Sequence, residues 1–339
     1  MERILIGDQS EVLVGRRLEL SLPPREGRER VAILFQPEVP TEVLDRVARA
    51  ISDAEVEQIE IPDRERAKEL EAIGDVYDRL AAFNLGRGDT VVGVGGGAAT
   101  DVAGFVAATW LRGVESVLIP TTLLGAVDAS IGGKTGINRR GKNLVGAFWH
   151  PSRVLVDLDV LDRLPDRLRV EGSAEIVKAG LIGDPDIVAA YAGGGMATSL
   201  EDVVARAISV KAGVVSRDFR EAGERAILNF GHTIGHAVEI QSGMAHGFAV
   251  SIGMVAAGVV SARRHGFDTE WLTELLFSMG LPVAAAGVSI GPALDLIARD
   301  KKRTADGIRM VLLRSVGDPV VEPVTEGDLE AALLAIGAS

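Results

Sequence analysis

The sequence predicts an α/β N-terminal domain of the Rossmann-like, nucleotide-binding type, followed by a mostly α-helical C-terminal domain. Three observations lead to this fold class. Strand and helix patterns alternate in the first half, a glycine run separates one strand from its helix, and long helical patterns dominate after Pro165. A chain of 339 residues exceeds the usual size of a single core. We therefore expect two domains, over residues 1–165 and 166–339.

The first domain is predicted from short apolar runs that alternate with helical patterns. A long helix is expected over 67–84, because Leu70, Ile73, Val76 and Leu80 fall on one stripe. Strands are expected at 31–35, 56–61, 90–94, 117–119 and 154–156, and further helices at 41–51 and 100–111. This order predicts a parallel sheet covered by helices.

The second domain is predicted from alanine-rich helical patterns. Helices are expected at 171–182, 200–216, 232–241, 248–265 and 271–279, with a single strand at 310–313. The most apolar stretch, residues 248–262, is too short for a bilayer span and is typical of a buried helix. We expect no membrane association.

Composition excludes several classes of function. The net charge of −12 argues against a nucleic-acid partner, which requires a basic face. The absence of cysteine excludes disulfides and thiolate metal sites, so a metal would need nitrogen and oxygen ligands. The N-terminus lacks the apolar stretch of a signal peptide, and we expect a cytoplasmic protein.

Glycines point to an anion site. The run of residues 93–97 lies between a strand and a helix, where backbone N–H groups and a helix N-terminus can meet a pyrophosphate. A tight turn without a ligand is an equally good interpretation of this run alone. Thr121 and Thr122 follow the next strand, and the loop over 127–143 places glycines beside lysines. The alternative for that loop is a mobile surface segment with solvated lysines.

Histidines point to a metal. His232, His236 and His246 fall within one fifteen-residue window, and imidazole is the commonest ligand for zinc-like metals. His232 and His236 are four residues apart and share a helix face, so both could bind one ion. Glu175 lies among apolar residues, where an acid is costly unless it is paired or coordinated. This glutamate and two histidines would form a three-ligand site, the catalytic pattern. Ordinary hydrogen-bonded histidines remain the alternative.

Several long motifs, in order, resemble one family. The stretches are residues 95–101, 120–124, 128–138, 172–178 and 229–236. Together they resemble 3-dehydroquinate synthase, a member of the sugar phosphate cyclases, over residues 62–313. The resemblance implies NAD and a divalent metal, zinc or cobalt, as cofactors, and a homodimer.

The resemblance also implies roles for individual residues. It assigns the metal to Glu175, His232 and His246, and moves His236 from the metal to proton handling beside the substrate. Other catalytic residues would be Lys134, Asn143, Lys178, Arg225 and Asn229. Substrate contacts would be Arg112, Asp128, Lys211, Glu221, Lys301 and Lys302. The NAD contacts would be Glu65, Lys68, Gly95, Gly96, Gly97, Asp101, Thr121, Thr122, Leu124 and Lys142.

The implied reaction converts 3-deoxy-D-arabino-heptulosonate 7-phosphate to 3-dehydroquinate and phosphate, a step of the shikimate pathway of aromatic amino acid biosynthesis. It proceeds by transient oxidation with NAD, phosphate elimination, reduction and intramolecular aldol closure, which makes the enzyme a carbon–oxygen lyase. Three residues depart from the family pattern and affect the shape of the pockets: Arg64, Leu168 and Phe248. The alternatives are another sugar phosphate cyclase, such as aminodehydroquinate synthase, a metal- and NAD-dependent polyol dehydrogenase, and a catalytically silent relative.

Overall fold

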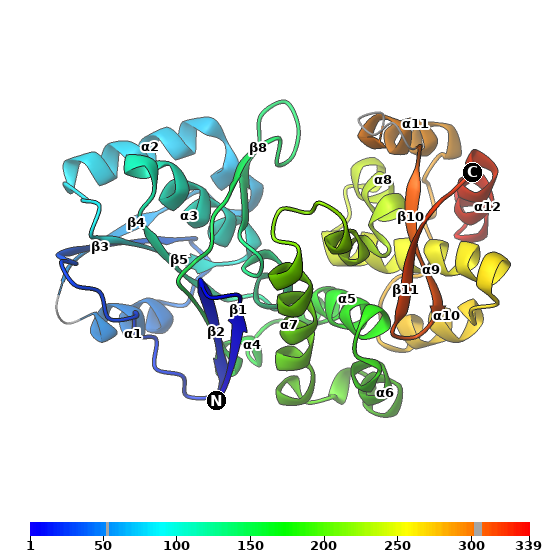
Figure 1. The fold of residues 1–339 in the computed structure, drawn as a ribbon, viewed down its shortest axis with the longest axis horizontal. Coiled ribbons are helices and arrows are strands. Elements are labelled where there is room, and N and C mark those ends of the chain that lie inside the picture. The colour runs from blue at the N-terminus through cyan, green and yellow to red at the C-terminus, as the bar shows by residue number, and fades with distance from the viewer. Residues whose placement is uncertain (52–53, 302–306) are drawn as a thin grey trace. The chain divides into compact units, whose positions relative to one another are not determined.

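A computed structural model describes residues 1–51, 54–301 and 307–339. They form two compact units (Figure 1). The first unit comprises Met1–Pro165 and Lys211–Arg220, and the second comprises Asp166–Val210 and Glu221–Ser339. The sequence placed Lys211–Arg220 in the second domain, whereas the structure groups this segment with the first unit.

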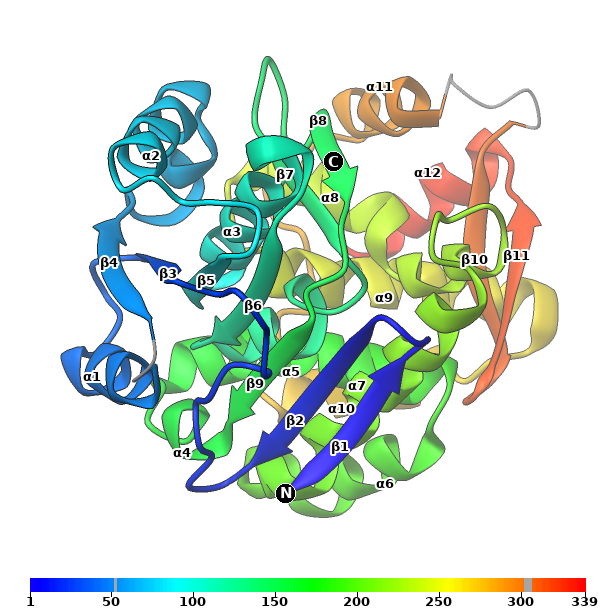
Figure 2. The same cartoon turned by 60° about the vertical axis from the view of Figure 1, so that its left-hand side comes forward.

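The first unit is built on a seven-stranded sheet in the order β1-β2-β9-β6-β5-β3-β4. All neighbouring strands are parallel except β1 and β2, which form an antiparallel edge (Figure 2). The strands are β1 (Glu2–Ile6), β2 (Ser10–Gly15), β3 (Arg30–Phe35), β4 (Glu55–Glu60), β5 (Thr90–Gly95), β6 (Glu115–Pro120) and β9 (Arg153–Asp157). The predicted parallel sheet is confirmed, and the β1–β2 edge was not foreseen.

Helices cover both faces of this sheet, with α2 and α3 on one side and α1 on the other (Figure 1). The helices are α1 (Thr41–Ala50), α2 (Leu70–Ala82), α3 (Gly97–Thr109) and the short α4 (Leu158–Leu161). The unit also contains the 3₁₀ turns η1 (Arg64–Lys68) and η2 (Trp110–Arg112), the π-turn η3 (Gly125–Ala129), and a hairpin of β7 (Lys134–Ile137) and β8 (Val145–Phe148). Val31, Ile33, Val92 and Val94 are buried in the core cluster that α1 completes. On the other face α3 comes so close to Gly93 that a Cβ there would lie 2.5 Å from the Ala103 Cβ.

The predicted helix over 67–84 is interrupted in the structure. Residues Arg64–Lys68 form η1, and α2 begins only at Leu70. Glu69 between them is extended, with φ −75° and ψ 145°, and pairs with Asn138 as an isolated parallel bridge. A tertiary contact therefore overrides the local helical pattern.

The second unit is mostly helical, as predicted. Its elements are α5 (Asp166–Ile182), α6 (Pro185–Gly194), η4 (Gly195–Ala197), α7 (Leu200–Arg217, ending in the first unit), η5 (Glu224–Asn229), α8 (His232–Ser242), α9 (His246–His265), α10 (Thr269–Ser278), α11 (Ile290–Lys301), β10 (Arg309–Ser315), β11 (Asp318–Pro323) and α12 (Glu326–Ala335). Instead of a single strand at 310–313, β10 pairs with β11 as an antiparallel hairpin. The sequence pattern did not predict β11, because it has a proline near each end and proline within a run argues against a strand.

Helix α9 is the core helix of this unit. By length and apolar composition it could cross a membrane, which the predicted fifteen-residue stretch could not. However, 72% of its most apolar window is buried inside the structure. This burial is typical of a core helix and agrees with the prediction of a buried segment.

Glycines let α8 and α9 pack almost backbone to backbone. A Cβ on Gly253 would lie 1.9 Å from the carbonyl oxygen of Gly231, and one on Gly235 would lie 2.9 Å from that of Ala249. Gly231 itself has φ +79° and directly precedes His232. The close crossing therefore fixes the segment that begins α8.

We expect Gly253→Ala to lower the free energy of unfolding by about 3 kcal/mol, the upper end for an overpacked core, because the new methyl meets backbone rather than a side chain that can move. Denaturant unfolding would measure this change. Gly193→Ala, in α6, is the matched control. A Cβ there meets nothing within 4 Å, so this variant should gain about 0.5–1 kcal/mol. Equal stability of the two variants would contradict the steric argument.

Candidate metal centre and nucleotide site

Three helices of the second unit bring Glu175, His232 and His246 together. Glu175 lies within α5, and the two histidines are the first residues of α8 and α9. The Glu175 Oε1 atom lies 3.7 Å from Nε2 of His232 and 3.8 Å from Nε2 of His246. All three ligand atoms lie within 4.8 Å of one another. The side chain of Glu175 is only 2% exposed, so this cluster closes around a buried carboxylate.

A close contact between two helices places His246 beside α5. A Cβ on Gly247 would lie 2.1 Å from the carbonyl oxygen of Glu171, one turn before Glu175. Burial raises the pKa of Glu171, while the Gly247 N–H and the nearby His246 act in the opposite direction. A glycine at position 247, directly after His246, is therefore required for the start of α9 to pack against α5.

The three facing atoms fit a divalent cation. Nδ1 of His232 lies 3.2 Å from the carbonyl oxygen of Phe230. A carbonyl only accepts, so Nδ1 carries a hydrogen, and in the neutral ring Nε2 presents its lone pair to Glu175. The buried Oε1 of Glu175 has no hydrogen-bond partner in the part of the chain that the structure describes. Two facing lone pairs repel unless a cation lies between them, and two ligands of a tetrahedral zinc are about 3.4 Å apart.

Polar and basic side chains accompany this cluster in the second unit. The Lys178 ammonium pairs with Oε2 of Glu175 and is buried. Arg225, in η5, is 2% exposed. Asn229 donates from Nδ2 to Oε1 of Glu221 at 3.3 Å. A buried cation is costly unless it is paired, and the Glu175 carboxylate pairs with Lys178 here.

The glycine run lies at the carboxyl end of β5, where the helix of the next crossover begins. Gly95 has φ +150°, Gly96 caps α3 and Gly97 is its first residue. A Cβ on Gly96 would lie 3.3 Å from the Cγ2 atom of Thr122. Strand β4 lies on one side of β3 and strand β5 lies on the other, so the direction in which successive strands are added reverses between β3 and β5. Open α/β sheets bind ligands at such a switch point.

Residues at the carboxyl end of β6 and in the turn that follows it complete this group. The amide N–H of Gly125 donates to Oγ1 of Thr122 at 3.0 Å, and the amide N–H of Thr121 donates to the Gly95 carbonyl at 2.8 Å. Leu124 caps the π-turn η3. Backbone and hydroxyl groups at the carboxyl ends of β5 and β6 therefore converge.

A buried ion pair joins α3 to η1 and to the loop over 138–143. Nζ of Lys68 lies 2.5 Å from Oδ2 of Asp101 and 2.5 Å from Oδ1 of Asn143. Glu65 accepts from Nδ2 of Asn138 at 2.6 Å. Burial raises the pKa of Asp101 to about 6, against the opposing effect of the Lys68 ammonium.

A second ion pair of the first unit joins Lys211 to Asp128. The Lys211 ammonium donates to the Asp128 carbonyl at 2.6 Å and also pairs with the carboxylate of the same residue. Lys134 opens β7 and is exposed, as is Lys142 in the loop that follows. The structure thus brings together Asp128 and Lys211, and it leaves these two lysines at the surface.

The remaining predicted residues lie in different places. Arg112 is exposed at the end of η2, with a left-handed φ of +67°. His236 is exposed and lies with Glu239 and His246 in a second group of ligand-type atoms. Neither group of ligand-type atoms among the described residues contains both His232 and His236, the pairing that helical spacing alone allowed. Lys301 ends α11, and Lys302 lies outside the described residues.

Two polar residues at these sites were not predicted. Gln36 follows β3 and accepts from the Gly96 amide at 3.3 Å. Its position at a strand end beside the switch point was the signal that could have found it. Glu239 accepts from the His246 ring at 3.0 Å. No local pattern marks this glutamate, because the contact depends on the turn between α8 and α9.

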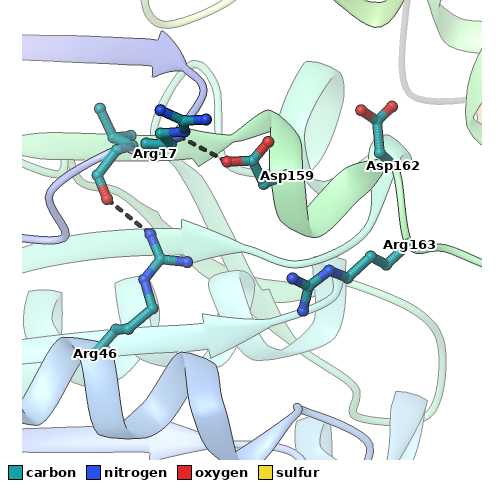
Figure 3. Close-up of a pocket in the computed structure, with 6 residues that line it drawn as sticks. Arg17, Arg46, Asp159, Asp162 and Arg163 are labelled. Carbon is teal, nitrogen blue, oxygen red and sulfur yellow. Dashed lines mark hydrogen bonds between the residues drawn. The ribbon is translucent and has the colours of Figure 1, made fainter.

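A surface pocket of about 550 Å³ lies elsewhere in the first unit and contains none of the predicted residues. Its lining residues are Arg17, Leu18, Arg46, Asp159, Asp162 and Arg163 (Figure 3). The Arg17 amide donates to Oδ2 of Asp159, and Arg46 donates to the Leu18 carbonyl, both at 2.7 Å. Three arginines and two aspartates line this pocket, and ion pairs of Arg46 with Asp157 and of Arg163 with Glu42 are typical of a structural ion network.

Two family models together match residues 58–303, which is most of the chain. The model for the 3-dehydroquinate synthase N-terminal region matches residues 58–171, and the model for the C-terminal region matches residues 172–303. A 3-dehydroquinate synthase of Mycolicibacterium vanbaalenii is 45% identical over 308 residues, covering 87% of this chain and 86% of that protein. One of Corynebacterium efficiens is 41% identical over 346 residues, covering 96% and 94%.

Solved structures agree at the level of the fold. A 2-deoxy-scyllo-inosose synthase complexed with carbaglucose-6-phosphate, NAD⁺ and Co²⁺ superposes with a TM-score of 0.88 at 27% identity, covering 98% of each chain. The 2-epi-5-epi-valiolone synthase ValA of Streptomyces hygroscopicus subsp. jinggangensis, with NAD⁺ and Zn²⁺ bound, gives 0.87 at 28%, covering 96% of each. A glycerol dehydrogenase of Schizosaccharomyces pombe shares the fold, at 0.65 and 16%.

Proposed function

Because the chain belongs to the 3-dehydroquinate synthase family, we propose that it converts 3-deoxy-D-arabino-heptulosonate 7-phosphate to 3-dehydroquinate and phosphate with NAD and a divalent metal. The observation that carries this proposal is the buried Oε1 of Glu175, which faces the Nε2 atoms of two histidines. A cyclase needs this constellation, since its first step acts on a ring alcohol. The curated relatives at 40–45% identity support the carboxylated substrate.

In this proposal Glu175, His232 and His246 hold the metal, and the glycine turn after β5 holds the pyrophosphate of NAD. When bound, the cation supplies Lewis-acid polarisation of an alcohol oxygen, and the dinucleotide supplies a hydride acceptor that returns the hydride later. Gly95, Gly96 and Gly97 let the backbone approach the phosphates, because a Cβ would block it. Thr121, Thr122, Leu124, Glu65 and Lys142 complete the NAD contacts.

The substrate carries a phosphate and a carboxylate, and the chain supplies cations for both. Lys178 and Arg225 are buried, and Lys211 is held by Asp128. In the proposal Lys134 binds the substrate carboxylate or oxyanion, while Asn143, Lys178 and His236 act near the leaving phosphate. Asn229, Glu221, Arg112, Lys301 and Lys302 make further substrate contacts. A net acidic protein thereby concentrates positive charge where the anionic substrate binds.

Binding of NAD⁺ should depend on the ionisation of Asp101, whose carboxylate pairs with Lys68. Since burial raises the pKa of Asp101 to about 6, acidification below this value protonates the carboxyl group and breaks the ion pair. We expect the Kd for NAD⁺ to rise by about tenfold between pH 7 and pH 5. Calorimetric titration of the protein with NAD⁺ at each pH would measure this change.

Asp101→Asn is the control for this pH dependence. It removes the titrating group and should give a Kd that is flat over the same range, although weaker at pH 7. The same pH profile in both proteins would show that another group controls the affinity.

The reaction itself is tested with the purified protein, the heptulosonate phosphate, catalytic NAD⁺ and Co²⁺ or Zn²⁺. We expect inorganic phosphate and a carbocycle in equal amounts, no net NADH, and no reaction after chelation. Glucose 6-phosphate, which lacks the carboxylate, distinguishes a cyclase of the inosose type. Net NADH from a polyol without phosphate release would instead identify a dehydrogenase.

We further propose that the protein is a cytoplasmic homodimer, as the resemblance to the family implies. Light scattering on the purified chain tests the assembly state. A single mass of about 36 kDa, one copy of this 35.7 kDa chain, would contradict the dimer.

A further inference from the structure

The two imidazoles of the proposed metal site use their ring nitrogens in the same way. Each directs Nε2 toward Oε1 of Glu175 and has its Nδ1 beside an oxygen of the protein. For His232 that oxygen is the Phe230 carbonyl. For His246 it is Oε2 of Glu239, at 3.0 Å. A neutral imidazole has one donor and one acceptor, so a hydrogen on Nδ1 leaves the lone pair on Nε2.

His246 is shared between two groups of ligand-type atoms. One group contains Glu175 and His232, and the other contains His236 and Glu239. The Nδ1 atom cannot donate to Glu239 and also ligate an ion in the second group. The 3.0 Å separation is an ordinary hydrogen-bond length. His246 therefore faces the first group with Nε2, while its Nδ1 is occupied by the bond to Glu239.

We propose that Glu239 is a positioning residue for the metal site. It accepts the Nδ1–H of His246 and thereby fixes both the tautomer and the orientation of the ring, so that Nε2 faces Glu175. Metal-ligating histidines commonly donate their second N–H to a carboxylate in this way. This inference deepens the proposed function and rests on its assignment of the metal to Glu175, His232 and His246.

The local backbone explains how Glu239 reaches a residue seven positions later. Gly243 caps the C-terminus of α8. It has φ +67°, and its N–H donates to the Glu239 carbonyl. This left-handed turn reverses the chain, and three residues later His246 begins α9. The side chain of Glu239 is only 13% exposed and that of His246 is 27% exposed. The hydrogen bond is therefore largely shielded from water, which strengthens it.

A second carboxylate faces the same histidine and provides the sharpest comparison. Glu171, on α5, also interacts electrostatically with His246 and Glu239, but its hydrogen bond comes from the Gly247 backbone N–H rather than from the ring. If negative charge beside His246 were sufficient, the two glutamates would be equivalent. If the bond to Nδ1 is what matters, only Glu239 supports the metal.

The test measures Co²⁺ affinity by competition with a chromophoric chelator, without substrate or NAD⁺. We expect Glu239→Ala to weaken Co²⁺ binding by about 10- to 100-fold and to alter the visible absorption of bound Co²⁺. Glu239→Gln keeps a carbonyl acceptor for Nδ1–H and should recover most of the affinity and the native spectrum. Glu171→Gln should stay within about threefold of the unaltered protein. Thermal unfolding of the metal-free variants verifies that each one folds.

Three results would overturn the inference. The first is Co²⁺ affinity in Glu239→Ala equal to that of the unaltered protein, and the second is an equal loss of affinity in Glu239→Ala and Glu171→Gln. The third is binding of two Co²⁺ ions per chain with one lost in Glu239→Ala, which would assign His236, Glu239 and His246 to a second ion. Since the titration contains no substrate, these outcomes are independent of the phosphate-release assay. Failure of that assay alone would instead contradict the proposed reaction.

Discussion

His232→Ala is expected to lose the bound metal and to reduce turnover by about 10³-fold or more. The variant removes one of the three proposed ligands and leaves the buried Oε1 of Glu175 facing a single imidazole. Loss of about 4 kcal/mol of Lewis-acid stabilisation corresponds to about 10³-fold in rate. Elemental analysis of the purified variant and phosphate release under saturating NAD⁺ would measure both effects.

His265→Ala is the matched control for this variant. His265 lies in the last turn of α9, near Glu322 and away from the ligand group. Its replacement should leave metal content and turnover unchanged. One metal ion per chain in purified His232→Ala would show that the ligand set is wrong.

His236→Ala is expected to retain the metal and to lose turnover by about 10²- to 10⁴-fold, the range that positioned proton transfer contributes. His236 lies one helical turn from His232, with ring centroids 5.1 Å apart, but it does not belong to the group that contains Glu175. The effect should appear in kcat, because this residue is proposed to move a proton rather than to bind the ion.

Elemental analysis and steady-state kinetics together separate the roles of the two histidines. Loss of metal from His236→Ala would assign this residue to the coordination sphere. Full activity would exclude it from proton transfer. His236→Gln, which keeps a polar side chain but carries no titrating group, should be as slow as the alanine variant.

Most of the fold was predictable because the patterns in this sequence are local. The parallel strands, the glycine run before α3 and the helix that begins at His232 each follow from residues that are adjacent in the chain. The edge strands β1 and β2 were missed, although each contains an apolar triplet, residues 4–6 and 12–14, as long as the predicted strands at 117–119 and 154–156. The extended conformation of Glu69 was not predicted, because it depends on pairing with Asn138, about seventy residues later.

The candidate site shows the same division between local and distant information. The sequence itself put Glu175 among apolar residues and clustered the histidines, but spacing alone favoured His232 with His236. Only the family resemblance selected His246 instead. The choice depends on the Gly243 turn and on the close approach of Gly247 to α5. These are tertiary features, which no window of the sequence contains.

The segment Lys211–Arg220 has a practical consequence for dissecting this protein. A fragment that stops at residue 165 retains Asp128 but lacks Lys211, the cation that binds its carbonyl and carboxylate. The complementary fragment carries ten residues whose native neighbours are missing. Separate expression of the two halves would therefore leave the first unit incomplete. A fragment for nucleotide binding would need residues 211–220 joined to residues 1–165 through a linker.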